Sequence, residues 1–407
     1  MNILIAVENG FSARYILRTS ILDKLLQEDH KIVVVSPNAN EAYFSEWLSK
    51  KGITVIAPPA LKAGSGRNLQ SLLELVRYYG MPNTDSGANI EIKYRDYLNR
   101  HPMRPLFLNT FSAAVQAHRK YRGIRAILIK IGNLYDVGAY RAIIKEHKVS
   151  LLVLDGIGST GPHVSNWARA AYKLCSSVTV ITNWDHPTTK GYRSVPTDRY
   201  LVWGQPMSDE LVRYQDIPQE RIRKVGSVLF DHYFNDGVLL DRSSVCIKLG
   251  LDEARPIVLY ISNSPINFPH NLDIVQFLFN FLDDLPSKPQ LLVRLHPLYA
   301  IPGAANEIAE HKKFALENKI TYSIPHVLSN VLMPDMEMDE IILSNSLIKS
   351  ADVVVNMFST MQLDACMCDK PTINIGFDWG EGGTKYPESQ PLRELHSFKK
   401  NKLYESS

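Results

Sequence analysis

The chain of 407 residues is poor in cysteine, in net charge and in long apolar runs. Its four cysteines lie mostly far apart, which is typical of a protein kept in a reducing compartment. A formal net charge of +3 is small for a dedicated nucleic-acid binder. No stretch approaches the ~18 uncharged apolar residues that a membrane span needs, and the first residues, MNILIAVENGF, lack the features of a signal peptide. We therefore expect a cytoplasmic protein.

Patterns typical of metal sites are also missing. Cys366 and Cys368 lie in a helix-like stretch without histidine partners, which argues against a zinc site. No Asp-x-Asp motif follows a predicted strand where a charged substrate would bind. We therefore expect chemistry that needs no bound metal ion.

What the sequence does contain is a regular alternation of short apolar runs and helical patterns. Unbroken apolar runs are typical of strands covered on both faces, as in the parallel sheet of an α/β domain. We predict strands at residues 2–7, 31–37, 53–58, 150–156, 177–183, 199–204, 255–264, 290–297, 320–325, 351–357 and 371–377. The helical spacing of apolar residues predicts helices at 12–28, 68–79, 107–122, 137–147, 271–283, 339–350 and from about 360.

A chain of 407 residues is longer than one hydrophobic core ordinarily accommodates. We therefore predict two doubly wound Rossmann-like domains that face each other across a cleft. The expected parts are an N-terminal acceptor-side domain at 1–225, a linker region at 226–254, a C-terminal donor-binding domain at 255–385, and a tail at 386–407 that can return as a helix to the first domain. Ligands of such sheets bind at the carboxyl ends of the strands, so we expect the site in the cleft.

In the second domain, the strand at 290–297 ends in a basic residue and a histidine. Arg294 and His296 stand where the apolar run stops, and Pro297 ends the strand. One interpretation makes this strand end an anion-binding site, and the competing one makes His296 a capped core histidine. Ser264, after the first strand of this domain, is either a further phosphate contact or an ordinary loop residue.

A Ser-Thr pair follows the strand at 351–357. Ser359 and Thr360 stand where the next helix begins, where backbone N–H groups and hydroxyls can hold a phosphate. Asp364, one helical turn further, could accept hydrogen bonds from a ribose diol. The alternative makes Ser359 or Thr360 an ordinary helix cap.

In the first domain, ionisable side chains also follow predicted strands. They are Glu8, Asp155, Asp185 and His186. A transfer to a hydroxyl acceptor needs a group that takes the hydroxyl proton, and a carboxylate or imidazole can do this. For any single acid, a structural cap is the commoner role, but we expect one of this set to be the base.

Residues 351–378, ADVVVNMFSTMQLDACMCDKPTINIGFD, resemble the donor-binding segment of GT-B glycosyltransferases and of the related CDP-glycerol glycerophosphotransferases. In that group a basic-x-His-Pro motif precedes the segment, as Arg294 to Pro297 do here. Residues 183–227 are similar to a segment of surface-polysaccharide enzymes of the same group. Asp155-Gly156 partly matches an acid-acid-Gly motif of polysialyltransferases, although Leu154 replaces the first acid.

The resemblance implies a GT-B enzyme that moves a sugar from a nucleotide-sugar donor to a cell-surface polysaccharide or a lipid-linked glycan, by inversion and without a metal or a separate cofactor. It implies that the donor diphosphate contacts Arg294, His296, Ser359 and Thr360, with Asp364 on the ribose. The base would be Asp185 or Asp155. Three alternatives remain open: a glycerol- or polyol-phosphate transferase with a CDP-linked donor, an enzyme like UDP-N-acetylglucosamine 2-epimerase, and a non-catalytic nucleotide-sugar-binding protein.

Basic residues accumulate in the segment 97–135, which contains no acid. They are Arg100, Arg104, Arg119, Lys120, Arg122, Arg125 and Lys130, and Leu106, Phe107, Leu108 and Phe111 lie between them. The segment is either a solvated helix face or a docking surface for an anionic membrane or a lipid-linked acceptor. The absence of a base-stacking platform argues against RNA.

Overall fold

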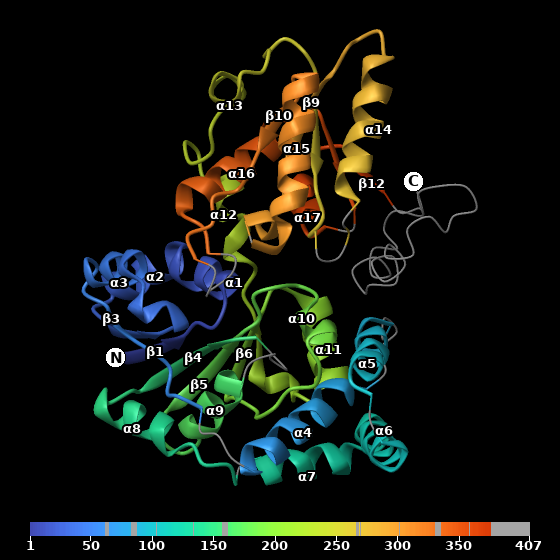
Figure 1. Cartoon of the computed structure of the whole chain (residues 1–407). Helices are drawn as coiled ribbons and strands as arrows, with labels where there is room; N and C mark the ends of the chain where they lie inside the picture. The colour runs from blue at the N-terminus through green and yellow to red at the C-terminus, as the bar shows by residue number, and fades with distance from the viewer. Residues whose placement is uncertain are drawn as a thin grey trace. The chain divides into compact units, whose positions relative to one another are not determined.

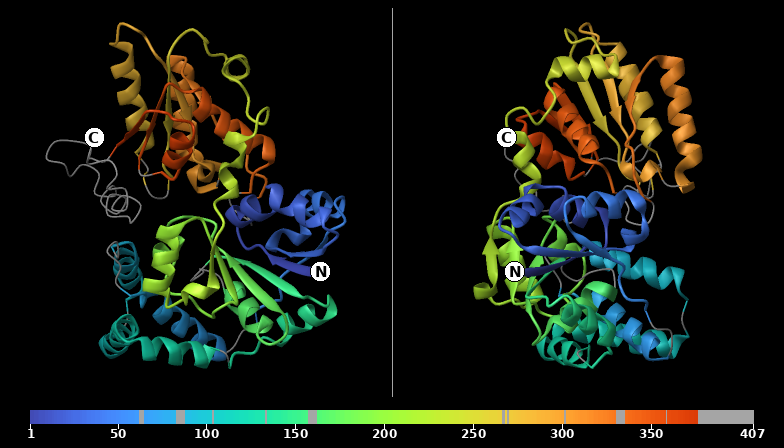
Figure 2. Two further views of the ribbon diagram at one scale, coloured as in Figure 1. Left: turned by 180° about the vertical axis from the view of Figure 1, so that it is seen from behind. Right: turned by 90° about the vertical axis from the view of Figure 1, so that its left-hand side faces the viewer.

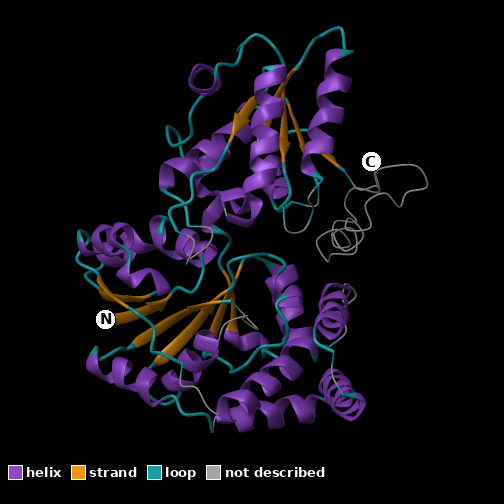
Figure 3. Ribbon diagram, in the orientation of Figure 1, coloured by secondary structure: helices purple, strands orange, loops and turns teal. Residues whose placement is uncertain are grey.

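The computed structural model describes most of the chain, in two compact units (Figure 1). The described residues are 1–61, 65–82, 88–102, 104–132, 134–156, 162–265, 268, 270–300, 302–329, 335–357 and 359–375. The first unit comprises Met1–Val228, and the second begins at Leu229. The expected tail at 386–407 lies outside the described residues. Each unit has a parallel sheet with helices beside it (Figure 3), so the predicted α/β class is confirmed.

The first unit is built on a seven-stranded sheet in the order β3-β2-β1-β4-β5-β6-β7. Its strands are β1 (Asn2–Ala6), β2 (Lys31–Val35), β3 (Thr54–Ile56), β4 (Leu151–Asp155), β5 (Ser176–Val180), β6 (Arg199–Val202) and β7 (Ile222–Lys224). All neighbours are parallel, and central β1 pairs Ile3 with Ile32 of β2 and with Leu151 of β4. Since every strand runs the same way, all the carboxyl ends lie at one edge of the sheet.

The helices of the Rossmann-like core cover this sheet. They are α1 (Gly10–Ser12), α2 (Ser20–Gln27), α3 (Ala42–Ser49), α8 (Gly138–Glu146), α9 (Pro162–Ala171), α10 (His186–Thr189) and α11 (Gln205–Gln215), with a π-helical turn at Ala13–Leu17. Tyr140 and Ile144 of α8 and Trp167 of α9 pack in one cluster with Leu152 and Leu154 of β4. This cluster fixes β4 and therefore the position of Asp155 at its end.

A group of helices between β3 and α8 forms an insertion with a core of its own. Its members are α4 (Ser65–Tyr79), α5 (Ala88–Arg100), α6 (Pro105–Lys120) and α7 (Arg122–Gly132). Figure 2 shows them grouped together beside the first sheet. Val76, Tyr79, Tyr94, Phe111 and Val115 form their shared apolar cluster. The sequence predicted α4 and α6 but not α5 or α7.

The second unit has a five-stranded parallel sheet in the order β10-β9-β8-β11-β12. Its strands are β8 (Ile257–Ile261), β9 (Gln290–Arg294), β10 (Thr321–Ser323), β11 (Val353–Asn356) and β12 (Thr372–Asn374), and its helices are α12 (Asp231–Phe234), α13 (Arg242–Leu249), α14 (Asn271–Asp283), α15 (Ala305–Asn318), α16 (Met338–Ser350) and α17 (Met361–Met367). Alternate residues of β8 join two different clusters, Val258 and Tyr260 on one face and Ile257 and Leu259 on the other. The sheet is therefore covered on both faces, as its unbroken apolar strands predicted.

A chain of buried polar side chains runs through the core of the second unit. The hydroxyl of Tyr260 donates to Asn271 Oδ1 at 2.9 Å, and Asn271 Nδ2 donates to the hydroxyl of Tyr299 at 3.1 Å. His311 lies between two tyrosines, with Nε2 3.4 Å from the hydroxyl of Tyr299 and Nδ1 3.1 Å from that of Tyr322. Both ring nitrogens of His311 are thus engaged inside the protein, so this histidine has a structural role.

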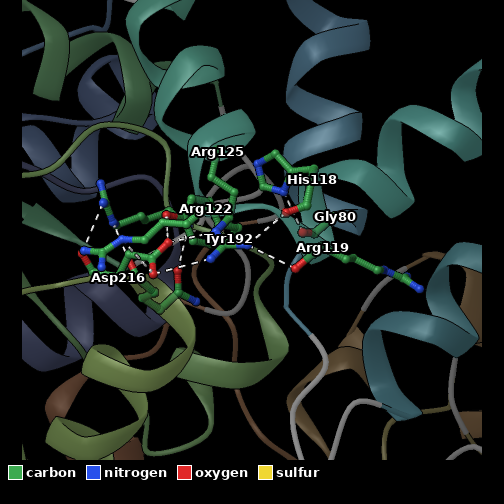
Figure 4. A network of polar contacts seen from close by, with 9 residues as sticks. Gly80, His118, Arg119, Arg122, Arg125, Tyr192 and Asp216 are labelled. Carbon is green, nitrogen blue, oxygen red and sulfur yellow. Dashed lines mark hydrogen bonds and ion pairs between the residues drawn. The ribbon is translucent and has the colours of Figure 1, made fainter.

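Gly80 and His118 join α4 to α6 at very close range (Figure 4). His118 Nδ1 lies 2.5 Å from the carbonyl oxygen of Gly80, which makes Nδ1 the protonated nitrogen. Burial lowers the pKa of His118 to about 4, so the ring is neutral at physiological pH. A Cβ atom on Gly80 would lie 2.6 Å from His118 Nδ1 and 2.8 Å from His118 Cβ.

We predict that Gly80→Ala lowers the free energy of unfolding by roughly 1–3 kcal/mol, because the new methyl group would meet the carbonyl oxygen of Val76 as well as His118, so that both the end of α4 and α6 must shift. Urea unfolding followed by circular dichroism measures the change. Gly123→Ala in α7 is the matched control, since no atom lies within 4 Å of its added Cβ, and the substitution should leave stability unchanged or slightly raised. Equal effects of the two substitutions would contradict the packing argument.

Candidate functional site

The carboxyl edge of the first sheet gathers the acids that the sequence singled out. Asp155 ends β4 and is 6% exposed. Its Oδ1 accepts from Thr182 Oγ1 at 2.7 Å, and its Oδ2 accepts from Asn9 Nδ2 at 3.3 Å and from the hydroxyl of Ser12. Asn9 and Ser12 follow β1 and Thr182 follows β5, so Asp155 at the end of β4 ties β1, β4 and β5 together at their ends. Both of its carboxyl oxygens already have partners.

Glu8 lies beside Asp155, two residues beyond the end of β1. Its carboxyl accepts a hydrogen bond from the backbone N–H of Val164, at the start of α9. Its Oε1 is buried and has no hydrogen-bond partner among the described residues. Burial, and secondarily the charge of Asp155, raise the pKa of Glu8 to about 8. Glu8 is therefore mostly protonated at pH 7 and can exchange a proton near neutral pH.

Asp185 and His186 follow β5 and form a second buried pair. Asp185 Oδ2 accepts from Thr189 Oγ1 at 2.8 Å, while Asp185 Oδ1 and His186 Nδ1 have no partner among the described residues. Burial opposes ionisation of Asp185, but His186, Lys190 and Lys93 outweigh it and hold the pKa of this carboxyl below its usual value. Burial lowers the pKa of His186. Asp185 is therefore an ionised group in a buried setting.

Lys93 reaches this edge from α5 of the insertion. Its Nζ donates to the carbonyl oxygen of Thr189 at 3.1 Å. Burial lowers the pKa of Lys93 to about 8, with a smaller contribution from the charge of Lys190. Neither Lys93 nor Lys190 was among the predicted site residues. Lys190 stands beside the Asp185-His186 pair and could have been found there, but nothing local in the sequence relates Lys93 to Thr189.

In the second unit, His296 stands just beyond β9 and is fixed by its neighbours. Its backbone N–H donates to Ser262 Oγ at 2.9 Å, and its Nδ1 accepts from the backbone N–H of Leu298 at 3.0 Å. Burial lowers the pKa of His296 to about 4, so the ring is neutral and carries its proton on Nε2. His296 thus offers a neutral N–H donor, in contrast to His311, whose two nitrogens both have partners in the core.

Two buried polar groups beside His296 lack partners. Ser264 Oγ and Asn356 Nδ2 belong to residues that are 4% and 0% exposed, and neither atom has a partner among the described residues. Ser264 follows β8, which lies between β9 and β11, and Asn356 ends β11. A buried donor without a partner is costly, and a ligand oxygen would satisfy it. The adjacent ends of β9, β8 and β11 therefore present a row of hydrogen-bond donors.

Asn356 was not among the predicted site residues. Its signal in the sequence is a polar residue at the end of the apolar run VVVN, the same kind of signal that identified Asp155. Asn263 supports the arrangement, because its Nδ2 donates to the carbonyl oxygen of Met357 at 3.0 Å and joins the loops after β8 and β11.

Arg294 is the predicted phosphate ligand whose surroundings differ most from the expectation. The residue is 4% exposed. Its Nη2 forms an ion pair with Glu340 Oε1 at 2.6 Å, and its Nη1 donates to Ser323 Oγ at 2.7 Å. The guanidinium is turned toward α16 and β10 and holds the end of β9 in place. The partner acid is 46 residues away in the chain, so the sequence pattern did not reveal it.

The two residues of the Ser-Thr pair differ: one acts as a helix cap, and the other makes no capping hydrogen bond. Ser359 Oγ accepts from the backbone N–H of Met361 at 3.2 Å, which is the capping role. Thr360 is exposed, and its side chain makes no capping hydrogen bond. Asp364 is 8% exposed and accepts from the hydroxyl of Tyr233 at 2.8 Å. Contact of these three residues with a donor stays a prediction.

Arg119 and Arg125 of the basic segment 97–135 are engaged inside the first unit (Figure 4), whereas Arg100, Arg104, Lys120, Arg122 and Lys130 are exposed. Arg125 Nε lies 2.8 Å from Asp216 Oδ2, and Arg122 lies 3.5 Å from the same acid. Arg119 pairs with Glu91 at 2.7 Å and donates to the carbonyl oxygen of Tyr79.

The docking-surface interpretation is wrong for Phe111, which is 3% exposed and lies in the shared apolar cluster of helices α4 to α7. Arg125 is also buried. The acids that neutralise the arginines come from outside the segment, so the absence of acids within 97–135 gave a misleading picture of its charge.

Membrane spans and metal clusters were sought in the described part of the chain. None of the helices described there is both long and apolar enough to cross a bilayer. The same residues contain no group of three or more histidine, cysteine or acidic side chains arranged to hold a metal ion.

Comparison with known proteins identifies similar folds. No protein-family model matches the chain, and no curated protein matches it. Among solved structures, S. aureus MnaA, in a co-structure with UDP, has a TM-score of 0.50 at 10% identity and covers 98% of this chain and 90% of its own. A UDP-GlcNAc 2-epimerase from Methanocaldococcus jannaschii gives 0.48 at 13% identity, with 97% and 92% covered. A glycosyltransferase from Rickettsia africae gives 0.47 at 13% identity, with 92% and 78% covered. These identities are too low to show more than the fold, which is a GT-B-like pair of Rossmann-like domains.

Proposed function

We propose that this protein is a GT-B glycosyltransferase that moves a sugar from a nucleotide-sugar donor to a cell-surface polysaccharide or lipid-linked glycan. The observation that carries the proposal is the row of donors at the ends of β9, β8 and β11: His296 Nε2, Ser264 Oγ and Asn356 Nδ2. Phosphate oxygens accept hydrogen bonds and donate none, so they match a row of donors. The UDP present with the similarly folded S. aureus MnaA supports the choice of a nucleotide ligand.

The proposed leaving group is the nucleoside diphosphate, stabilised by fixed hydrogen-bond donors. Donors that are already oriented cost no reorganisation when negative charge develops on the bridging oxygen. His296 is well suited because Leu298 fixes its tautomer and burial keeps the ring neutral. Arg294 supports the site indirectly, because its ion pair with Glu340 holds the strand that carries His296.

A transferase of glycerol or polyol phosphate would use the same donor row with a CDP-linked donor. A thermal-shift panel of UDP, CDP, CMP, GDP and dTDP separates these possibilities, because only a ligand of the folded state raises the melting temperature. Stabilisation by CDP alone would favour the polyol-phosphate alternative, and stabilisation by UDP would favour sugar transfer.

We predict that His296→Ala weakens the nucleotide selected by the panel about ten- to a hundredfold. The loss corresponds to one hydrogen bond to a charged group, roughly 1.5–3 kcal/mol. Isothermal titration calorimetry measures the affinity.

His311→Gln is the matched control for this prediction, since His311 is also buried and neutral but has both nitrogens engaged by tyrosines. It should lower the melting temperature and leave the nucleotide affinity unchanged. An unchanged affinity in folded His296→Ala would return His296 to the role of a core histidine.

Arg294 is predicted to act through structure. Arg294→Met leaves Glu340 buried without its partner, which should cost about 3–5 kcal/mol of unfolding free energy. The double change with Glu340→Met removes both charges and should recover most of that loss, as read from urea unfolding. A double variant that regains stability but not nucleotide affinity would show instead that Arg294 contacts the donor.

Activity is predicted to survive EDTA, because the proposed donor site stabilises the diphosphate by hydrogen bonds from the protein. Release of the nucleotide from the nucleotide-sugar, followed by anion-exchange chromatography with and without EDTA, tests this. Loss of turnover that is restored by magnesium or manganese would contradict it.

A further inference from the structure

Glu8 is an acid of the first unit with a buried carboxyl oxygen, Oε1, that has no partner among the described residues, and the proposed function leaves its role open. Asp155 is engaged through both carboxyl oxygens, by Thr182 on one and by Asn9 and Ser12 on the other. Glu8 shares its location at the carboxyl edge of the central strands but keeps Oε1 without a partner among the described residues. A buried carboxyl oxygen without a donor is costly, so it points to a group supplied from outside the protein.

We propose that Glu8 is the group that takes the proton from the acceptor hydroxyl, while Asp155 is a positioning residue that holds the strand ends around it. This inference rests on the proposed function. Glu8 Oε1 is the free acceptor, and the N–H of Val164 binds the carboxyl and orients it. An acceptor O–H that donates to Oε1 would satisfy the unpartnered atom and place its proton on the base in one contact.

The surroundings of Glu8 suit a base that works near neutral pH. Burial and then the charge of Asp155 raise its pKa to about 8. The other titratable groups nearby are Tyr140 of α8, which interacts electrostatically with Glu8, and His163, whose Nδ1 lies 2.7 Å from the hydroxyl of Tyr140. Burial lowers the pKa of His163, so this neighbour is neutral and does not oppose the raised pKa of Glu8.

His186 also interacts electrostatically with Asp155. The charge of Asp155 raises the pKa of His186, but burial is the larger effect and lowers it. Among the described residues, the groups that set the pKa of Glu8 include no cation. The lysines of this edge act instead on Asp185, which stays ionised beside them. Glu8 can therefore exchange a proton near neutral pH, whereas Asp185 keeps its charge. This difference between the two carboxyls assigns the proton transfer to Glu8.

In the proposed step, the bond that forms at the anomeric carbon is matched by one that breaks there. The ionised Glu8 carboxylate takes the proton of the acceptor hydroxyl, and the electron pair left on the acceptor oxygen forms the new bond to the anomeric carbon. The bond from that carbon to the donor diphosphate breaks, and its electron pair leaves on the diphosphate oxygen. Glu8, now neutral, returns its proton to water before the next cycle.

Glu8→Gln tests the assignment in the full-length protein, because the amide keeps the shape of the side chain but cannot take a proton. The probe reaction is hydrolysis of UDP-glucose, UDP-N-acetylglucosamine and CMP-sialic acid, with water as the acceptor, followed by nucleotide release across pH 6 to 9.5 (an assay range). In the unsubstituted protein kcat/KM should rise to a plateau above about pH 8 (the pKa of Glu8). In Glu8→Gln the rate should fall about 10²- to 10⁴-fold and the inflection near pH 8 should disappear, with nucleotide affinity unchanged.

A second readout needs no substrate. The infrared carbonyl band of a protonated buried carboxyl should disappear with a midpoint near pH 8 in the unsubstituted protein and should be missing in Glu8→Gln. Folding is checked by the same variant, since the folded-state pKa lies above the unfolded value. Glu8 therefore stabilises the fold below about pH 4.5 and loses that contribution as pH rises through about 8, so Glu8→Gln should be the more stable protein at pH 9.

The outcomes separate the two proposals. If the unsubstituted protein binds no nucleotide in the panel, the proposed function fails, and this inference fails with it. If nucleotide binds and Glu8→Gln keeps both the rate and the inflection, or if no carboxyl band titrates near pH 8, the assignment of Glu8 alone is overturned. Loss of the inflection in Asp185→Asn but not in Glu8→Gln would transfer the role to Asp185.

Discussion

In both units, the parallel sheet is buried on its two faces, and this burial determines where polar residues can lie. Nearly every side chain of strands such as β1 and β8 is packed in the core, so polar groups can gather only where the strands end. Parallel pairing places all the carboxyl ends on one edge, and residues distant in sequence meet there. Asp155 shows the effect most clearly, because a single carboxylate receives hydrogen bonds from segments that follow β1 and β5. The candidate chemistry of the protein is a consequence of this constraint.

The architecture was largely predictable from the sequence because its signals are local. The predicted helix at 271–283 has the bounds of α14, and every predicted strand overlaps an observed one. Strand ends were placed one or more residues too late: the predicted strands 2–7 and 290–297 end at Ala6 and Arg294. The short edge strand β7 was missed, and so were helices α3, α5, α7, α9, α10, α11, α12, α13 and α15. Of these, α10 and α12 have only 4 residues each, too few to show a helical repeat of apolar positions.

The site was only partly predictable, because the partners of charged groups are remote in sequence. In the sequence, a basic residue at a strand end looks the same whether it binds a ligand or pairs with an internal acid. Arg294 forms an ion pair with Glu340. The arginines between 119 and 125 were read as surface charge because Glu91 and Asp216 lie outside their segment. Conversely, the lack of a partner for Asn356 Nδ2 and for Glu8 Oε1 among the described residues is a property of three-dimensional burial. Such a state has no signature in composition or spacing.

The placement of Lys93 gives the helical insertion a role beyond packing. Its ammonium group comes from α5, yet it helps to keep Asp185 ionised at the edge of the sheet. Outward displacement of α5 would withdraw a positive charge and make the Asp185 carboxyl more basic. By thermodynamic reciprocity, a change of charge at Asp185 alters how firmly α5 is held. The position of α5 and the protonation of Asp185 are therefore coupled through the charge of Lys93.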